Sequence, residues 1–244
     1  MTNRNLLFVF AHPDDESFSS GVTIAKYAQQ TGSEVYLLCA TRGQAGKPGN
    51  PPVCTMEELP QVREQELRLA AGILGIKELQ ILDHQDKCLG EVPLEQLQGE
   101  IAGAIDRWQP SVVVTFAPHG ISGHPDHQAI SRVTDLTVKS LPLEKNPVQK
   151  LYHVTLPLEL LAANQYGDPL DKISTTISAP EYKAVVGQAL RAHKTQHLSV
   201  QRAFPGVMEG NDDQVREQNY FILAWAKRAE MLSEKTTDLF AGVL

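Results

Sequence analysis

The segment Ala11-His12-Pro13-Asp14-Asp15-Glu16 places one histidine and two aspartates within four consecutive positions. Three ionisable groups this close together are costly to bury without partners, whereas together they suit a divalent cation. We therefore predict that His12 and Asp15 bind a divalent metal and that Asp14 works beside it. The alternative is an ordinary surface loop that is rich in charge.

A second cluster, Gly123-His124-Pro125-Asp126-His127, supplies candidates for a third metal ligand. Proline is favoured at the first position of a helix, so His124 is expected at the N-cap and His127 in the first turn. Residues three positions apart share one face of a helix, and both histidines can therefore point into one cleft. The alternative is again a surface loop, but two such clusters form a stronger signal than one.

Each cluster follows an apolar run, residues 6–10 in the first case and 111–116 in the second. Apolar runs without polar alternation are typical of parallel strands that are buried on both faces. Ligands of open parallel sheets bind beyond the carboxyl ends of the strands. The two strands would therefore position both clusters at one edge of a sheet.

Between these two runs the chain alternates between strand and helix patterns, which predicts a parallel sheet with helices on both faces. The further expected strands are residues 34–40 and 78–82, and the expected helices are 18–30, 56–74, 93–108 and 124–140. Residues 42–52, rich in glycine and proline, are expected to form an active-site loop or a plain connector. No GxGxxG follows the first strand, so a dinucleotide site is not expected.

The pattern changes after Pro147. We predict a strand at residues 150–156, helices at 180–194 and 215–232, and an exposed loop at 204–213, while residues 158–177 receive no interpretation. The predicted fold is α/β, a Rossmann-like three-layer α/β/α arrangement with a mostly parallel sheet. One domain is expected over residues 1–244, with the metal site in a core of 1–145 and with strands and helices of 146–244 completing the cleft.

Composition indicates a globular protein that does not act on nucleic acid. The chain has 244 residues, 42% of them hydrophobic, and a net charge of −7 without a basic run, which argues against nucleic acid or anionic membrane as the main partner. No apolar run approaches the roughly 20 residues of a membrane span, and the first residues leave no room for a signal peptide. Three cysteines without CxxC spacing suggest reduced thiols and a cytoplasmic protein.

The two clusters, AHPDDE and GHPDH, resemble the motifs of the LmbE-like, or PIG-L, family of zinc-dependent N-acetylglucosaminyl deacetylases. Looser matches lie at residues 41–46, 62–75, 183 and 192–196, and the resemblance extends from about residue 5 to about residue 200. Two positions depart from the family pattern: Gln44, where members often carry Glu, and His119, where they often carry Asn. Both positions bear on substrate preference.

The resemblance implies that His12, Asp15 and His127 bind one zinc ion and that Asp14 is the general base. The same ligand set also suits iron(II), so the identity of the metal depends on the resemblance. With one carboxylate the site would keep a charge of about +1, which favours a bound hydroxide. The alternative for Asp14 is a helix N-cap near Ser17.

His124 is the candidate general acid, or a cationic stabiliser of the tetrahedral intermediate, and Asp126 is expected to raise its pKa and orient it. The alternatives are a fourth metal ligand or N-cap for His124, and a simple helix-start charge for Asp126. Arg63 resembles the family's substrate-binding arginine, and an ion pair with Glu66 is its alternative. His193 matches the family's C-terminal motif, where packing is the favoured interpretation.

The expected function is that of a cytoplasmic metal-dependent hydrolase. It would remove the N-acetyl group from a small molecule containing N-acetylglucosamine and release acetate and a free amine. One alternative is an amidase or deacylase for a different N-acyl substrate, and another is a sugar- or metal-binding protein without turnover. The aglycone and the formation of a homo-oligomer stay open.

Overall fold

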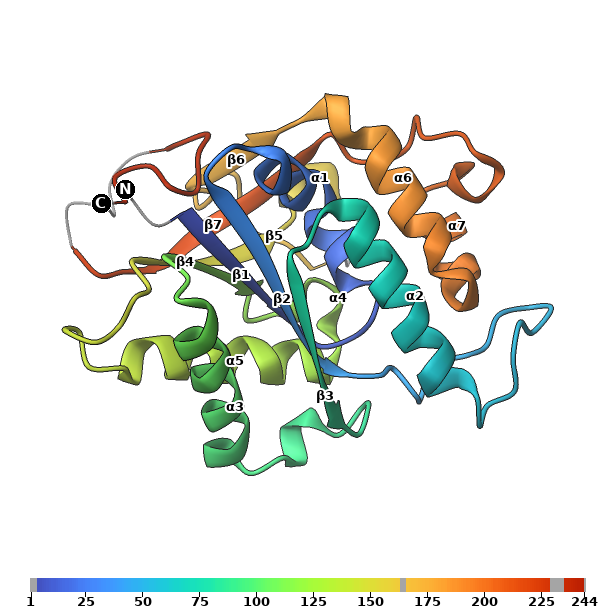
Figure 1. The fold of residues 1–244 in the computed structure, drawn as a ribbon. Coiled ribbons are helices and arrows are strands. Elements are labelled where there is room, and N and C mark those ends of the chain that lie inside the picture. The colour runs from blue at the N-terminus through green and yellow to red at the C-terminus, as the bar shows by residue number, and fades with distance from the viewer. Residues whose placement is uncertain (1–3, 163–165, 229–234, 244) are drawn as a thin grey trace.

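The computed structural model describes residues 4–162, 166–228 and 235–243. These residues form one sheet with the strand order β3-β2-β1-β4-β5-β7-β6, which lies between two layers of helices (Figure 1). The first five strands run parallel, and β7 is antiparallel to both of its neighbours. The strands are β1 (Arg4–Phe10), β2 (Ser33–Thr41), β3 (Glu78–His84), β4 (Val112–Phe116), β5 (Lys150–Thr155), β6 (Thr175–Ser178) and β7 (Gln218–Ala226).

Helices cover both faces of this sheet, as the strand–helix alternation predicted (Figure 1). One face is covered by α1 (Asp15–Gln29) and α2 (Leu59–Leu74), against which α6 (Lys183–Ala192) packs, and the other by α3 (Leu94–Trp108) and α5 (Pro125–Ser140). Two short helices, α4 (Gly120–Gly123) and α7 (His197–Ala203), follow β4 and α6 in the chain. The arrangement confirms the predicted α/β fold with a mostly parallel sheet.

β1 lies at the point where the strand order reverses. From β1 the chain proceeds to β2 and β3 on one side, whereas β4 and β5 lie on the other side. The side chains of residues 6–10 in β1 are completely buried, because helices cover both faces of the strand. The crevice beyond the carboxyl ends of β1 and β4 is the usual ligand position in such sheets, and both His-Pro-Asp clusters follow these two strands.

The expected helix at residues 215–232 is wrong for its described part, which contains the strand β7. Tyr220, Phe221, Ile222 and Trp225 are residues that favour strands, and β7 is hydrogen-bonded to β5 on one side and β6 on the other. Pairing with distant strands therefore overrides the local helical pattern. Residues 229–232 of that expectation lie outside the described residues.

The expectation of an exposed loop at residues 204–213 is wrong for part of the segment. Phe204 and Val207 are buried, and the ring of Phe204 packs against Phe18 of α1 at a centroid distance of 5.3 Å. The segment thus closes the core beside α1.

None of the described helices combines the length and the apolar character that a membrane-spanning segment requires.

Candidate metal and catalytic site

The three predicted metal ligands meet at the carboxyl end of β1. Nδ1 of His12 lies 3.1 Å from Nε2 of His127. Oδ2 of Asp15 lies 3.7 Å from that Nδ1, and Oδ1 of the same carboxylate lies 3.2 Å from that Nε2. Donors of a tetrahedral zinc site, each about 2.0–2.2 Å from the metal, are separated by roughly 3.3–3.6 Å. The two nitrogens and the carboxylate therefore face one another at spacings close to this range, as the donors to one small divalent cation would.

The outer nitrogen of His12 is held by two buried carboxylates. Nε2 lies 3.1 Å from Oδ2 of Asp126 and 3.1 Å from Oδ1 of Asp86, so Nε2–H is the donor to these carboxylates and Nδ1 is the nitrogen that faces His127. Burial lowers the pKa of His12, but the hydrogen bonds from Asp126 and Asp86 outweigh it and raise this pKa to about 10. A carboxylate behind the imidazole is typical of metal-binding histidines, and these negative surroundings favour a cation.

The ring of His127 is fixed in the tautomer that a metal ligand needs. Its Nδ1 donates to the carbonyl oxygen of Gly120 at 2.9 Å, so Nε2 is free to face Asp15. The ring stacks on Phe116 with a centroid distance of 4.1 Å. Gly120 has a φ of 70°, and a Cβ atom there would lie 2.8 Å from the Cβ of His127. Only glycine therefore allows this turn to approach the ring so closely.

Asp14 adopts an unusual backbone conformation next to the metal donors. Its φ of 109° is rare for a residue with a Cβ atom and costs on the order of 1–3 kcal/mol. Its carboxylate accepts a hydrogen bond from Arg63 at 3.2 Å. Burial raises the pKa of Asp14 to about 6, although Arg63 opposes this shift. Asp14 occupies the N-cap position of α1, but its side chain makes no capping hydrogen bond. The N-cap alternative therefore does not account for the carboxylate, which binds Arg63.

Arg63 is buried, with 4% of its surface exposed, and lies behind Asp14. It donates to the carbonyl oxygens of Gly43 at 2.8 Å and Pro13 at 2.5 Å. The alternative pair with Glu66 is wrong, because the carboxylate of Glu66 accepts the backbone N–H and the hydroxyl of Thr195. Arg63 also lines the cavity over the metal donors, and its contact with a substrate stays a prediction.

The expected pairing of His124 with the carboxylate of Asp126 is wrong. That carboxylate instead binds His12 and accepts the backbone N–H groups of Lys87 and Leu89. The N-cap alternative for His124 is confirmed, because its Nδ1 accepts the backbone N–H of Asp126 at 3.1 Å at the start of α5. The neutral ring therefore carries its hydrogen on Nε2.

The pKa of His124 is also shifted in the direction opposite to our expectation. Burial lowers this pKa below its ordinary value, and the positive charges of His12 and His127 lower it further. One nitrogen of each of these three histidines lies within 4.8 Å of the others. The alternative of His124 as a fourth ligand therefore stays open.

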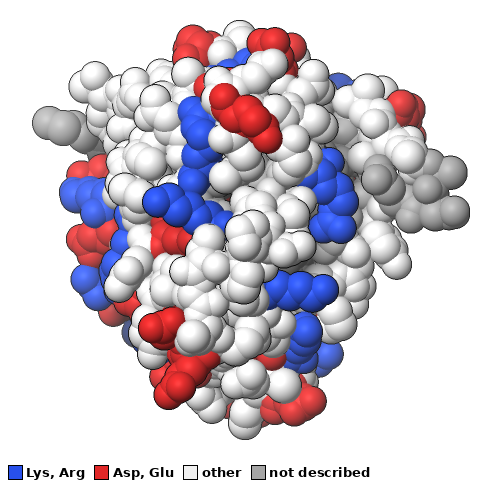
Figure 2. Space-filling model, turned by 90° about the vertical axis from the view of Figure 1, so that its right-hand side faces the viewer, with Lys and Arg blue, Asp and Glu red and all other residues white. Residues whose placement is uncertain are grey.

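A cavity of about 390 Å³ opens above these groups. Asp14, Asp15 and the histidines line it together with Phe18 and Ile121, and the expected active-site loop contributes Ala45 and Gly46. Lys87 and Arg202 also line it and are exposed. Figure 2 views the molecule from the right-hand side of Figure 1 and shows Lys and Arg in separate groups around a mostly uncharged middle.

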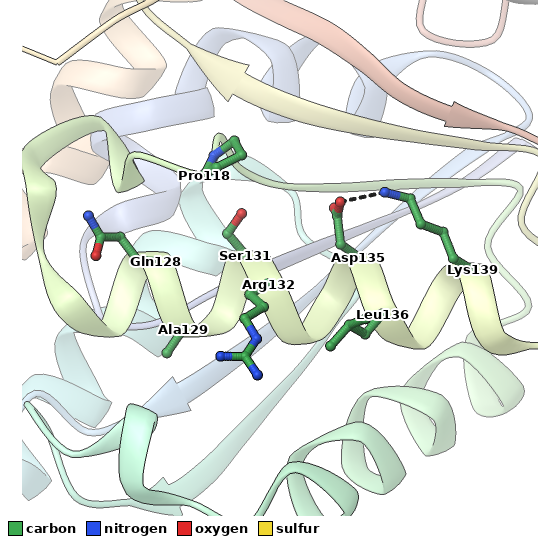
Figure 3. A pocket seen from close by; sticks show the side chains of 8 residues that line it. All are labelled: Pro118, Gln128, Ala129, Ser131, Arg132, Asp135, Leu136 and Lys139. Carbon is green, nitrogen blue, oxygen red and sulfur yellow. Dashed lines mark hydrogen bonds and ion pairs between the residues drawn. The ribbon is translucent and has the colours of Figure 1, made fainter.

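A larger cavity, about 570 Å³, lies along α5. It is lined by Arg132, Leu136 and an ion pair between Asp135 and Lys139 (Figure 3). None of the predicted site residues lines it. Volume therefore does not identify the candidate functional cavity. The smaller cavity is selected because histidines and carboxylates converge on it.

Sequence reasoning missed Asp86. Its carboxylate binds His12 and accepts the backbone N–H of Ala45 at 3.0 Å, so that it connects this predicted metal ligand with the 42–52 loop. The signal was present, because Asp86 follows the third parallel strand just as His12 follows the first. The rule that ligands gather beyond the carboxyl ends of parallel strands would have included it.

Asp126→Asn is expected to weaken metal binding by about 10- to 100-fold, because the loss of a carboxylate that orients a metal-binding histidine usually has this effect. The measurement is a Zn²⁺ titration of the chelator-treated protein. Asp135→Asn is the matched control. Asp135 lies on the same helix as Asp126 and also pairs with a histidine, His153, but away from the site. An unchanged metal affinity combined with a shifted pH profile of activity would instead assign Asp126 to His124.

Comparisons with known proteins identify the family of this chain. A family model described as PIG-L, GlcNAc-PI de-N-acetylase, matches residues 7–138. The chain is 34% identical over 194 residues to a protein of Bacillus anthracis named probable N-acetyl-alpha-D-glucosaminyl L-malate deacetylase 2, which covers 79% of this chain and 81% of the relative. It is 28% identical over 295 residues to the 1D-myo-inositol 2-acetamido-2-deoxy-alpha-D-glucopyranoside deacetylase of Thermomonospora curvata, which covers 99% and 98% of the two chains.

Solved structures share the fold. The N,N'-diacetylchitobiose deacetylase of Pyrococcus horikoshii matches with a TM-score of 0.66 at 21% identity, over 89% of this chain and 82% of that chain. The conserved protein TT1542 of Thermus thermophilus matches with a TM-score of 0.63 at 25% identity, over 93% and 96%. The family model covers more than half of the sequence and carries both His-Pro-Asp clusters, and the chain therefore belongs to the PIG-L, or LmbE-like, family.

Proposed function

We propose that this protein is a zinc-dependent hydrolase that removes the N-acetyl group from a small molecule containing N-acetylglucosamine. The products are acetate and a free amine. The observation that carries the proposal is the convergence of a three-donor metal site, the carboxylate of Asp14 and the imidazole of His124 on one cavity. The names of the relatives, which are deacetylases of N-acetylglucosaminyl compounds, support this substrate class.

The donor set fits zinc. Nδ1 of His12, Nε2 of His127 and the carboxylate of Asp15 would hold the ion, and two nitrogens with one carboxylate leave positions open for water and substrate. Without a metal, the positive charge of His127 outweighs the effect of burial and lowers the pKa of Asp15 to about 2. A bound cation would favour the ionised carboxylate in the same way. A bound divalent ion would supply Lewis acidity, which polarises the amide carbonyl and acidifies a water molecule.

Asp14 is the general base of the proposed reaction. A carboxylate with a pKa raised toward neutrality can take a proton from the attacking water and release it again, and Arg63 holds one oxygen of this carboxylate in place. The new C–O bond forms as that proton reaches Asp14. The C–N bond then breaks, and the proton moves to the leaving nitrogen, which departs as the free amine.

His124 is proposed to stabilise the oxygen of the tetrahedral intermediate. The lowered pKa keeps the ring neutral at pH 7, and the hydrogen bond that Nδ1 accepts leaves Nε2–H as a donor. A neutral donor can stabilise a developing negative charge without transferring a proton. The structure thus supports the stabilising role over the general-acid role for His124.

Two cations in the cavity support an anionic aglycone. Lys87 and Arg202 are exposed, and neither side chain has an ion-pair partner among the described residues. A carboxylate or phosphate on the aglycone would supply that partner. The L-malate in the names of the Bacillus relatives has this character, whereas the inositol of the Thermomonospora relative does not.

Two alternatives remain distinct from the proposal. A deacylase for a different N-acyl group would use the same metal site, and only its substrate profile separates it. A protein that binds sugar or metal without turnover requires neither Asp14 nor His124 at the cavity. The cytoplasmic location stays a prediction from the cysteine pattern.

The test of the proposed function is a panel of N-acetylglucosaminides and other N-acyl compounds, assayed for free amine with and without added Zn²⁺. Release of amine from the N-acetylglucosaminides is expected, and Asp14→Asn should lower kcat by about 10²- to 10⁴-fold, as for a lost general base. Its metal content should stay normal, whereas Asp15→Asn should lose metal. Turnover confined to other N-acyl compounds would favour the deacylase, and no turnover at all would favour the binding protein.

His124→Ala is expected to lower kcat by about 10²- to 10³-fold, the usual loss for one oxyanion donor. His124→Gln should recover part of this loss, because its amide N–H can replace Nε2–H. The measurement is kcat for both variants on the best substrate of the panel. Equal losses in the two variants would assign His124 to proton transfer instead.

Arg202→Ala is expected to raise KM about tenfold for an N-acetylglucosaminyl malate, because a contact with a remote carboxylate contributes mainly to uniform binding. KM for the uncharged inositol glycoside should not change. Arg132→Ala is the matched control, since Arg132 is exposed at the other cavity. An equal effect on both substrates would argue against an anionic aglycone.

A further inference from the structure

A buried chain of hydrogen bonds connects Asp14 with His193 at the end of α6. Nε2 of His193 lies 2.8 Å from Oε1 of Glu16, and the two residues are 0% and 1% exposed. The other oxygen of Glu16, Oε2, accepts the backbone N–H of Asp14 at 3.1 Å. The chain thus leads from His193 through Glu16 to the backbone of the proposed base.

The hydrogen bonds of Glu16 show which groups donate and which accept in this series of hydrogen bonds. Two groups meet at Oε1 of Glu16, which acts as their acceptor: Nε2–H of His193 at 2.8 Å and the hydroxyl of Ser17 at 2.6 Å. Nδ1 of His193 is buried and has no hydrogen-bond partner. A buried polar atom without a partner reduces stability, and the one hydrogen bond of this imidazole is directed at Glu16.

Asp14 needs such support because of its backbone. With φ at 109°, a residue with a Cβ atom keeps this conformation only where its surroundings impose it. Glu16 holds the N–H of Asp14, and Arg63 holds the preceding carbonyl of Pro13 and the carboxylate of Asp14. The position of the carboxylate therefore depends on contacts at both ends of the residue.

The turn that carries His193 connects the two helices behind the site. Thr195 donates its N–H and its hydroxyl to Glu66 of α2, at 2.8 and 2.6 Å. His193 reaches Glu16 of α1, and Gln196 lines the cavity. This turn lies outside residues 7–138, which the family model matches.

We propose that His193 is a positioning residue for Asp14 and acts through Glu16. The inference rests on the proposed role of Asp14 as the general base. His193 is not among the residues that line the cavity, so its loss should change the geometry of the base and not the binding of substrate. The expected effect is on kcat, with KM and metal content unchanged.

The experiment compares His193→Ala, His193→Gln, Asp14→Asn and the double variant Asp14→Asn/His193→Ala, each loaded with Zn²⁺. His193→Ala should lower kcat about 10- to 100-fold, because a displacement of about 1 Å at a catalytic group can cost about 10²-fold. His193→Gln places an N–H near the position of Nε2 and should recover most of the activity. The double variant should be no slower than Asp14→Asn, because the two residues act as one unit.

His153→Ala is the matched control. His153 is also buried, and its Nε2 pairs with Asp135 at 2.7 Å, away from the cavity. This variant loses a comparable histidine–carboxylate pair and should lower Tm without changing kcat. His193→Asn, whose shorter side chain does not reach Glu16, replaces His193→Ala if the alanine variant does not fold.

The outcomes separate this inference from the function on which it rests. If Asp14→Asn keeps full activity, the general-base role is wrong and the inference is wrong with it. If Asp14→Asn is impaired but His193→Ala is not, only the positioning role is overturned. Losses that multiply in the double variant, or a loss of zinc in His193→Ala, would likewise overturn it.

Discussion

The site depends on the carboxylates that surround the imidazole of His12. Asp15 lies near Nδ1, which faces the predicted metal, and Asp86 and Asp126 hold Nε2. They come from the start of α1, the segment after β3 and the start of α5, so three loops at one edge of the sheet meet on one ring. Backbone N–H groups compensate the buried charges, since Ala45 donates to Asp86 and the segment after β3 donates to Asp126. The parallel sheet thus brings the three carboxylates to one imidazole, and the hydrogen bonds to that imidazole connect the three segments.

Sequence reasoning succeeded where the signal was local. The apolar runs before His12 and before the second cluster predicted β1 and β4, and their parallel alignment brought His127 to within 3.1 Å of His12. The parallel sheet followed from the alternation of strands and helices. These features depend on side-chain periodicity and on general rules of α/β topology, both of which are visible in a single sequence.

It failed where partners lie far apart in the chain. We paired Asp126 with its neighbour His124, but its carboxylate binds His12, which is 114 positions away. We gave Arg63 the nearby Glu66 as an alternative partner, but its guanidinium contacts Asp14. The prediction of a helix in place of β7 was wrong for the same reason, because pairing with β5 decides the conformation of this segment. A buried charge takes the partner that the tertiary structure offers, and sequence distance does not indicate which one that is.

The position of β3 at the end of the sheet has a consequence for association between molecules. A strand with one free edge is a template for another chain, and natural sheets oppose this with charged side chains on such strands. β3 begins with Glu78, whose carboxylate accepts hydrogen bonds from Arg107 and Trp108 of α3. Near its other end Asp83 is paired with Arg42. These charges discourage edge-to-edge pairing and so help to keep the parallel sheet from aggregating.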